Sequence, residues 1–264
     1  KADSEDGSSV TFLKLSTVRG KCMAEAAATS EKGAMAAIQA KREVVAAAIA
    51  GLNGVKIANH NAPEQAVISG PAAGVEQAAK SLEAQGVRVT RLAVSGAFHT
   101  ELVASAQTGL SAAIAASTVG VPRISVYSNT TGKAYPADVA GIKSTLDGHL
   151  LNSVEFVAEI EAMHAAGVRV FVELGPKGTC ANMAKATLAG KNAQENLTCV
   201  SLDGNGGGLR GLLLGIAVQG KPEAAHGQGQ AQQKNHVGHD GTCGDPHQAG
   251  ARKQRNGRQS VLRS

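Results

Sequence analysis

Aromatic side chains are scarce in this chain of 264 residues: they make up 2% of it, and tryptophan is missing altogether. The hydrophobic core must therefore be built from Ala, Val, Leu and Ile, and hydrophobic residues reach 43% of the chain. The same scarcity argues against the aromatic platforms on which single-stranded nucleic acids stack. We therefore expect a globular protein without a nucleic-acid partner.

Long apolar runs are missing as well. No stretch approaches the roughly 20 apolar residues that a membrane helix requires, and the first residues, KADSEDGSS, are too polar for a secretion signal. The cysteines show no paired spacing, which is typical of proteins from a reducing compartment; they are Cys22, Cys180, Cys199 and Cys243. We expect a cytoplasmic protein without a membrane partner.

Positive charge is concentrated at one end of the chain. The net charge is +5, and residues 221–264 alone hold seven basic against three acidic side chains. This segment is rich in polar residues and poor in large apolar ones, so it cannot offset the entropy cost of ordering, and we expect a disordered tail. Its zinc-ligand residue types fit a low-complexity extension better than a metal site; they are His236, His239, Cys243 and His247.

Before the tail, strand and helix signals alternate. A helix is predicted over 13–29. The stretch 33–94 then predicts strands and helices in the order β-α-β-β-α-β, over 33–38, 41–52, 55–61, 65–70, 74–86 and 87–94. This is the order of a ferredoxin-like split unit with a four-stranded antiparallel sheet.

The rest of the chain predicts an α/β arrangement. Helices are expected over 101–117, 139–151, 154–166, from Thr179 and over 208–220, and strands over 124–129, 168–175 and 197–204. The strand VRVFVELG is almost wholly apolar, which favours a parallel sheet that is buried on both faces.

The most informative stretch is LAVSGAFHTELV, with His99 at its centre. A strand ends there, small residues make a tight turn, and a histidine stands at the start of a helix. A histidine presented in this way can act as the general base for a hydroxyl nucleophile. Taken alone, a single histidine at such a junction is more often structural.

SGAFHT and six further stretches together carry a family resemblance. SGAFHT resembles the signature of type I acyltransferase domains, whose histidine pairs with the serine of a G-H-S-x-G elbow. Further stretches resemble the same family in the same order: VRGKCM, GAMAAI, NHNAPEQAVISGP, HLLNSVEF and FVELGPKGTCANM, followed by VSLDGNGGG. The resemblance covers about residues 18–220. It is to the malonyl-CoA:ACP transacylase-like domains of polyketide and polyunsaturated fatty acid synthases, and to their C-terminal part.

The resemblance implies a domain organisation. A ferredoxin-like small subdomain occupies 33–94, and it is inserted in an α/β-hydrolase-like acyltransferase subdomain. The larger subdomain is represented by a remnant over 1–32 and by its C-terminal part over 95–199. A strand-helix linker over 200–220 and the tail over 221–264 follow.

The resemblance also implies roles for three residues. His99 matches the catalytic base, and Arg19 matches the arginine that pairs with the free carboxylate of a malonyl group. A planar guanidinium suits that task because it binds a carboxylate through two parallel hydrogen bonds; a solvated helix charge is the alternative for Arg19. His149 stands where relatives carry Gln or His, beside backbone that helps to orient the base, and simple helix packing is the open alternative.

The chain departs from the family pattern in its nucleophile. No G-x-S-x-G occurs in the sequence. In the family the serine precedes the VRGKCM helix, so we expect it, with the oxyanion hole, to lie before residue 1. Ser153 also replaces a usual proline, and Cys180 stands in the GPKGTCANM stretch, where a substitute nucleophile is a poor interpretation.

The resemblance implies malonyl transfer from coenzyme A to a serine and then to the thiol of an acyl carrier protein. Coenzyme A thioester is then a substrate, no cofactor or metal is bound, and other domains of a multidomain synthase are partners. The chain alone is expected to be inactive. The alternative is a non-catalytic module that docks a carrier protein or a synthase partner.

Overall fold

The computed structural model describes residues 8–29, 31–94, 96–190 and 197–203. The chain divides into two units, Lys1–Lys221 and Pro222–Ser264, and all described residues belong to the first. The helix predicted over 208–220 and the predicted tail lie outside the described residues. None of the helices that the structure describes is both long and apolar enough to span a membrane.

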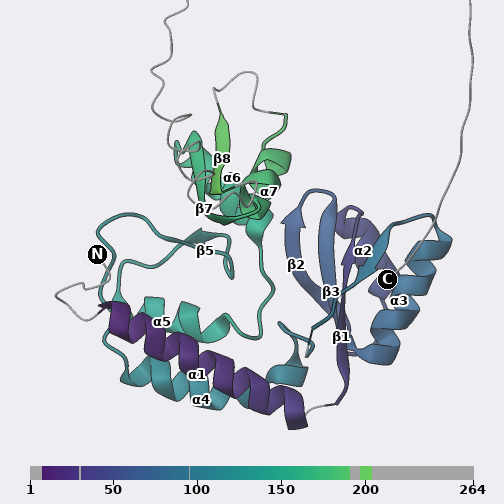
Figure 1. Ribbon diagram of the computed structural model, residues 1–264, viewed down its shortest axis with the longest axis horizontal. Helices are drawn as coiled ribbons and strands as arrows, with labels where there is room; N and C mark the ends of the chain where they lie inside the picture. The colour runs from purple at the N-terminus through teal and green to yellow at the C-terminus, as the bar shows by residue number, and fades with distance from the viewer. Residues whose placement is uncertain (1–7, 30, 95, 191–196, 204–264) are drawn as a thin grey trace, which may run out of the picture. The chain divides into compact units, whose positions relative to one another are not determined.

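A ferredoxin-like unit forms between Gly33 and Arg91, as predicted. Its elements are β1 (Gly33–Ile38), α2 (Arg42–Ile49), β2 (Lys56–Ala62), β3 (Gln65–Pro71), α3 (Ala72–Ala84) and β4 (Val89–Arg91). The strands pair in the order β2-β3-β1-β4, and every neighbouring pair is antiparallel (Figure 1). Gly86, predicted to end the second helix, follows α3 with a φ of 80° that a side chain would strain.

Aliphatic side chains alone fill the larger buried cluster of this unit, as the scarcity of aromatics predicted. Ile38, Val45, Ile68 and Leu82 are fully buried between the sheet and the two helices. β4 is shorter than its predicted range of 87–94. One bond on each side of β4 continues the pairing with the β1 segment: the amide of Leu92 donates to the carbonyl of Met35, and the amide of Gln39 donates to the carbonyl of Arg88.

A group of helices packs beside this unit (Figure 1). α1 (Ser8–Thr29) lies along α4 (Ser105–Ala116), and α5 (Val139–Gly148) contacts α4. The single helix predicted over 101–117 is divided, with a 3₁₀ turn over Glu101–Val103 before α4. The division follows from the side chain of Thr100, which accepts a hydrogen bond from the amide of Leu102 and so starts a separate turn.

A two-stranded parallel sheet forms the last group. β7 (Val170–Pro176) pairs with β8 (Thr198–Asp203), and α6 (Phe156–Ala165) and α7 (Thr179–Thr187) pack together beside it. The strand predicted over 124–129 is only β5 (Tyr127–Ser128), which pairs with β6 (Lys133–Ala134).

The predicted two-sided burial of β7 is wrong for the part of the chain that the structure describes. Phe171 is buried with residues of α6 and α7, whereas Val170, Val172 and Leu174 are 55%, 40% and 83% exposed. Successive strand residues point to opposite faces, and the two helices cover one face only. An apolar strand sequence predicts two covered faces without identifying what covers them.

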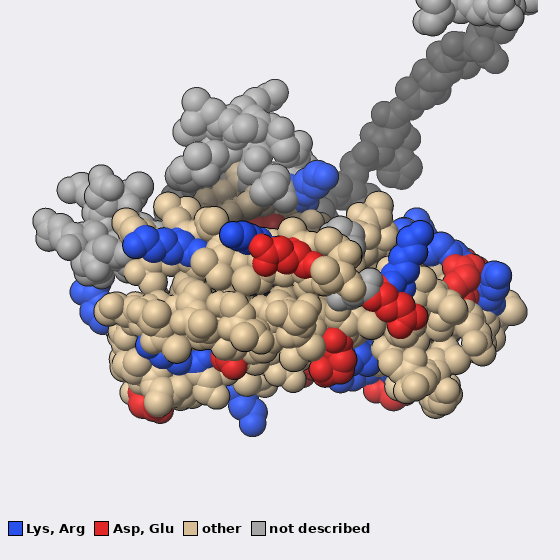
Figure 2. Space-filling view, turned by 90° about the horizontal axis from the view of Figure 1, so that it is seen from below, with Lys and Arg blue, Asp and Glu red and all other residues tan. Residues whose placement is uncertain are grey.

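Charge is distributed without a strong excess of either sign. Figure 2 shows Lys and Arg interspersed with Asp and Glu over a face that consists mostly of other residues. Arg91 forms ion pairs with Glu76 at 2.8 Å and with Glu83 at 2.7 Å. These exposed pairs contribute little to stability individually.

Gly70→Ala should destabilise the protein, since a methyl group at this position in β3 would meet backbone. A Cβ at Gly70 would lie 2.6 Å from the carbonyl oxygen of Gly54 and 2.8 Å from Cα of Val55. Backbone atoms cannot rotate away, so we expect a loss of about 1–3 kcal/mol in the free energy of unfolding, measured by urea denaturation.

The matched control is Gly20→Ala in α1, where a new Cβ would meet nothing within 4 Å. That change should be neutral or should stabilise the helix by about 0.5–1 kcal/mol. A Gly70→Ala protein as stable as the wild type would contradict the packing described for β3.

Candidate active site

His99 stands in a strained turn between β4 and the 3₁₀ turn. Its φ of 62° lies in the left-handed region, which costs a residue other than glycine on the order of 1–3 kcal/mol. The neighbouring Thr100 stabilises the turn: its hydroxyl donates to the carbonyl of Ala97 at 2.6 Å and accepts from the amide of Leu102 at 3.3 Å. The buried side chain of His99 is thus presented by a turn that is fixed on both sides.

The ring of His99 is oriented by the backbone of Asn152. Nδ1 of His99 lies 2.8 Å from the carbonyl oxygen of Asn152. A carbonyl oxygen can only accept, so Nδ1 must carry the proton of this bond. In the neutral ring, Nε2 then has a free lone pair and can accept a proton from another group.

The structure brings His149 and Arg19 to the same place. The rings of His99 and His149 are 6.2 Å apart between centroids and nearly perpendicular, at 86°. Nε2 of His149, at the C-terminal end of α5, lies 3.0 Å from Oδ1 of Asn129. Nε of Arg19, from α1, is buried and has no hydrogen-bond partner within the described part of the chain.

The electrostatics of the cluster favour neutral imidazoles. Burial lowers the pKa of His99; the bond to the Asn152 carbonyl opposes this, and the positive charges of His149 and Arg19 lower the pKa further. Burial also lowers the pKa of His149, and the charge of Arg19 adds to the effect. A neutral histidine is the form that can act as a general base.

Comparison with known proteins identifies the fold. Residues 8–223 match the family model of the acyl transferase domain. The chain belongs to this acyl transferase family. It is 36% identical over 173 residues to the malonyl CoA-acyl carrier protein transacylase of Bacillus subtilis, covering 63% of this chain and 54% of that protein.

Two further relatives extend the comparison. A protein of the polyunsaturated fatty acid synthase of Thraustochytrium is 33% identical over 136 residues, which are 51% of this chain and 5% of that protein. The crystal structure of the malonyl CoA-acyl carrier protein transacylase from Clostridium perfringens has a TM-score of 0.69 at 28% identity, covering 79% of this chain and 64% of that one. The acyltransferase resemblance is confirmed, and the chain spans less than two thirds of each relative.

Two further side chains, Cys180 and Ser111, are poor candidates for a nucleophile. Burial and the negative charges of Glu173 and Glu159 raise the pKa of the Cys180 thiol, so the thiol stays protonated. Ser111, in the sequence nearest to G-x-S-x-G, donates its hydroxyl proton to the carboxylate of Asp147 and links α4 to the end of α5. Both observations fit structural roles.

Sequence reasoning missed the contacts that hold the segment around Asn152. The amide of Val154 donates to the carbonyl of Ala58, and the carbonyl of Val154 accepts from the amide of His60, both at 2.8 Å. Glu155 forms an ion pair with Arg42, from α2. The NHN stretch of residues 59–61 provides backbone to this contact, but no local pattern in the sequence signals its partners.

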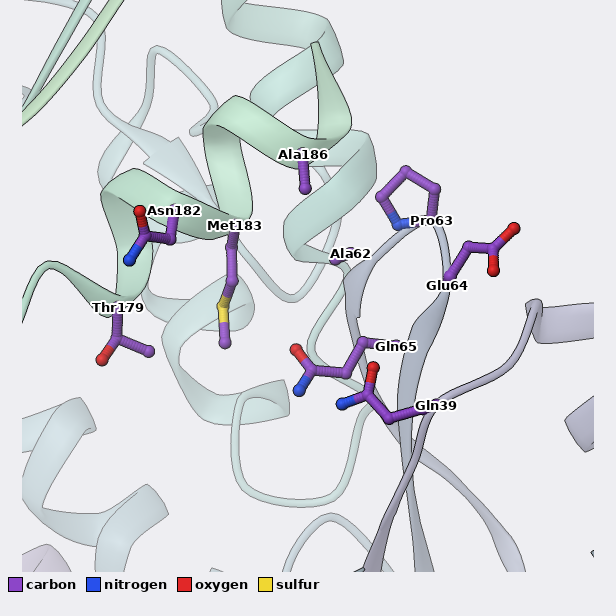
Figure 3. A pocket seen from close by; sticks show the side chains of 9 residues that line it. All are labelled: Gln39, Ala62, Pro63, Glu64, Gln65, Thr179, Asn182, Met183 and Ala186. Carbon is purple, nitrogen blue, oxygen red and sulfur yellow. The ribbon is translucent and has the colours of Figure 1, made fainter. Parts of the chain in front are cut away.

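A separate cavity lies between the β2–β3 hairpin and α7. It has a volume of about 480 Å³ and is lined by Gln39, Ala62, Pro63, Glu64, Gln65, Thr179, Asn182, Met183 and Ala186. Figure 3 shows Gln39, Gln65 and Met183 pointing into the same space. Among the described residues, no three His, Cys, Asp or Glu side chains are grouped so that they could hold a metal ion.

Protein stability should fall as the pH drops below neutrality. The reason is that the pKa values of His60, His99 and His149 are lowered in the folded protein, and burial is the largest cause for each. Below the ordinary histidine pKa of 6.5, the unfolded chain binds protons that the folded chain does not. The stability that these groups contribute is therefore present above that pKa and is lost as the pH falls. Urea denaturation at pH 7.5 and at pH 5.5 measures the loss.

His149→Gln provides the control, since glutamine can keep a hydrogen bond to Asn129 but does not titrate. The variant should lose less stability between the two pH values than the wild type. Glu159, whose pKa burial raises, acts in the opposite sense in both proteins and cancels in the comparison. An identical pH dependence in wild type and variant would contradict the assignment.

Proposed function

We propose that this chain is the histidine-bearing part of an acyltransferase domain that transfers malonyl groups from coenzyme A to an acyl carrier protein. The observation that carries the proposal is the ring of His99, held through Nδ1 so that Nε2 is free to accept a proton. The names of the Bacillus and Clostridium relatives support malonyl-CoA and a carrier protein as the substrates.

The proposal assigns the parts of the chain to an acyltransferase domain. Residues 33–94 form the small subdomain, and 1–32 with 95–199 belong to the large one. The Thraustochytrium relative belongs to a synthase, and the matched part is 5% of it, which supports a role beside other synthase domains. Cys22, Cys180 and Cys199 are free, as suits the reducing conditions of the cytoplasm.

His99 is proposed as the base for a nucleophilic serine. The 264 residues of the sequence contain no G-x-S-x-G motif that would hold this serine. Nε2 takes the hydroxyl proton while the serine oxygen attacks the thioester carbon; the carbon–sulfur bond then breaks, and the sulfur of coenzyme A leaves with that proton. In the second half, His99 takes the proton of the carrier thiol, whose sulfur attacks the serine ester. The carbon–oxygen bond breaks, and the proton returns to the serine.

Arg19 is proposed as the partner of the free malonyl carboxylate. Its buried Nε, without a partner in the described part of the chain, is a donor that a carboxylate could satisfy. Its charge reaches both imidazoles, so it lies close to the proposed reaction. His149 is proposed to border the same substrate site, with its ring nearly perpendicular to that of His99.

His99→Ala should abolish malonyl loading in a domain completed by a segment with the G-H-S-x-G serine of the family pattern. General base catalysis contributes about 10²–10⁴-fold, and mass spectrometry after incubation with malonyl-CoA measures the loading. The chain without that segment should not be loaded, because a base has no hydroxyl to activate. Malonylation of any Ser or Cys in the chain alone would show that the nucleophile lies within this chain, and would contradict the proposal. A docking module would bind the carrier protein but would not be loaded in either form.

Arg19→Ala should change the choice of acyl group. Malonyl loading of the completed domain should fall by about 10- to 100-fold, the loss expected for a hydrogen bond to a charged group, while acetyl loading remains. Lys21→Ala is the matched control, since Lys21 is an exposed cation on the same helix, 4.0 Å from Glu25. Equal losses of malonyl and acetyl loading in Arg19→Ala would contradict the carboxylate role.

A further inference from the structure

The position of His99 depends on a segment that is itself neither helix nor strand. The carbonyl that holds Nδ1 belongs to Asn152, between the end of α5 at Gly148 and the start of α6 at Phe156. The side chain of Asn152 donates to the carbonyl of Gly148 at 2.8 Å, which ties it to α5. Further bonds of the segment reach into the ferredoxin-like unit.

Backbone and side-chain bonds hold residues 151–154 against β2. Val154 forms a parallel bridge beside Asn59, with one bond to Ala58 and one from His60. The hydroxyl of Ser153 donates to the carbonyl of Ile57 at 2.6 Å. On the other side of Asn152, Nζ of Lys56 donates to the carbonyl of Leu151 at 2.8 Å.

Glu155 completes this contact with a bidentate ion pair. The two terminal nitrogens of Arg42, at the start of α2, donate to the two carboxylate oxygens of Glu155 at 2.5 and 3.0 Å. The hydrogen bond to Glu155 is the largest cause of the raised pKa of Arg42. The backbone amide of Glu155 donates to the carbonyl of Asn129 at 2.6 Å, and the side chain of Asn129 contacts His149. One residue thus connects α2 with the surroundings of both histidines.

We propose that Arg42 and Glu155 are a positioning pair, which holds residues 151–155 on β2 so that the Asn152 carbonyl keeps His99 protonated at Nδ1. The catalytic use of this tautomer rests on the proposed function above. The pair itself touches neither His99 nor the reacting atoms. Loss of the pair should free the segment at its end nearest α6, and the carbonyl of Asn152 should then hold the ring less firmly.

A second arginine network in the same unit separates positioning from general stability. Arg91 also binds a carboxylate through two nitrogens, at 2.8 and 3.0 Å from the oxygens of Glu76. It joins β4 to α3, away from the Asn152 segment, and is exposed to a similar degree, 46% against 39% for the side chain of Arg42. Arg91→Gln therefore removes a bidentate pair with Glu76, together with the pair to Glu83, without touching the segment.

The test is ¹⁵N nuclear magnetic resonance of the imidazole nitrogens, with the chain as it exists and His99→Gln to assign the signals. The wild type should show His99 with one protonated nitrogen, Nδ1. Arg42→Gln and Glu155→Gln should each give averaged nitrogen shifts and loss of the protected Nδ1 proton signal. Arg91→Gln should leave the His99 signals as in the wild type, and the exchanged pair Arg42→Glu with Glu155→Arg should restore them.

Unchanged His99 signals in folded Arg42→Gln and Glu155→Gln proteins would overturn the proposal, as would equal changes in Arg91→Gln. Arg42→Lys covers the case in which Arg42→Gln does not fold, because it keeps the charge and loses the bidentate geometry; an unchanged tautomer there also counts against the pair. These signals do not depend on malonyl transfer, so an inactive completed domain would refute the proposed function without touching this result.

In the completed domain, Arg42→Gln should lower kcat of malonyl loading by up to about 10²-fold, the loss expected from a misplaced catalytic group. KM should not change, because the pair does not contact the substrate. A rise in KM at constant kcat would assign the pair to substrate binding and overturn the positioning role.

Discussion

The hydrogen bond from Nδ1 of His99 to the carbonyl of Asn152 is the interaction on which the candidate site depends. It determines which nitrogen carries the proton, and therefore which nitrogen can accept one. The strained backbone of His99 would not persist without the bonds of Thr100 around it. The two sides of this bond come from distant parts of the chain, so the fold as a whole determines the tautomer.

The ferredoxin-like unit could be predicted from the sequence because its signals are local. Short aliphatic stretches predict the strands, and glycines indicate where the helices end, so the order of elements follows. The predicted ranges differ from the observed ones mainly at β4. The burial of β7 could not be predicted in the same way. Apolar residues on both faces of a strand favour burial of both faces, but Val170, Val172 and Leu174 are exposed because α6 and α7 pack on the other face.

The residues of the candidate site also differ in whether a local sequence pattern predicts them. His99, Arg19 and His149 were found through short stretches whose residues match a family pattern, and the structure brings the three together. Arg42 and Glu155 could not be found, because they are 113 positions apart and each alone resembles an ordinary surface charge. Only the docking of residues 151–155 on β2 shows that their pairing bears on the histidine.

Arg19 connects the recognition of the acyl group with the strength of the base. Its positive charge lowers the pKa of His99, which keeps the imidazole neutral but also makes it a weaker base. Under the proposed function, a malonyl carboxylate bound to Arg19 would neutralise much of that charge. The part of the pKa lowering that comes from Arg19 would then be removed, while burial, the largest cause, would continue to lower the pKa of His99. To that extent the ring would accept the serine proton more readily. An acetyl group carries no carboxylate and would leave the base weakened. Electrostatics alone would thus favour malonyl transfer in the chemical step as well as in binding.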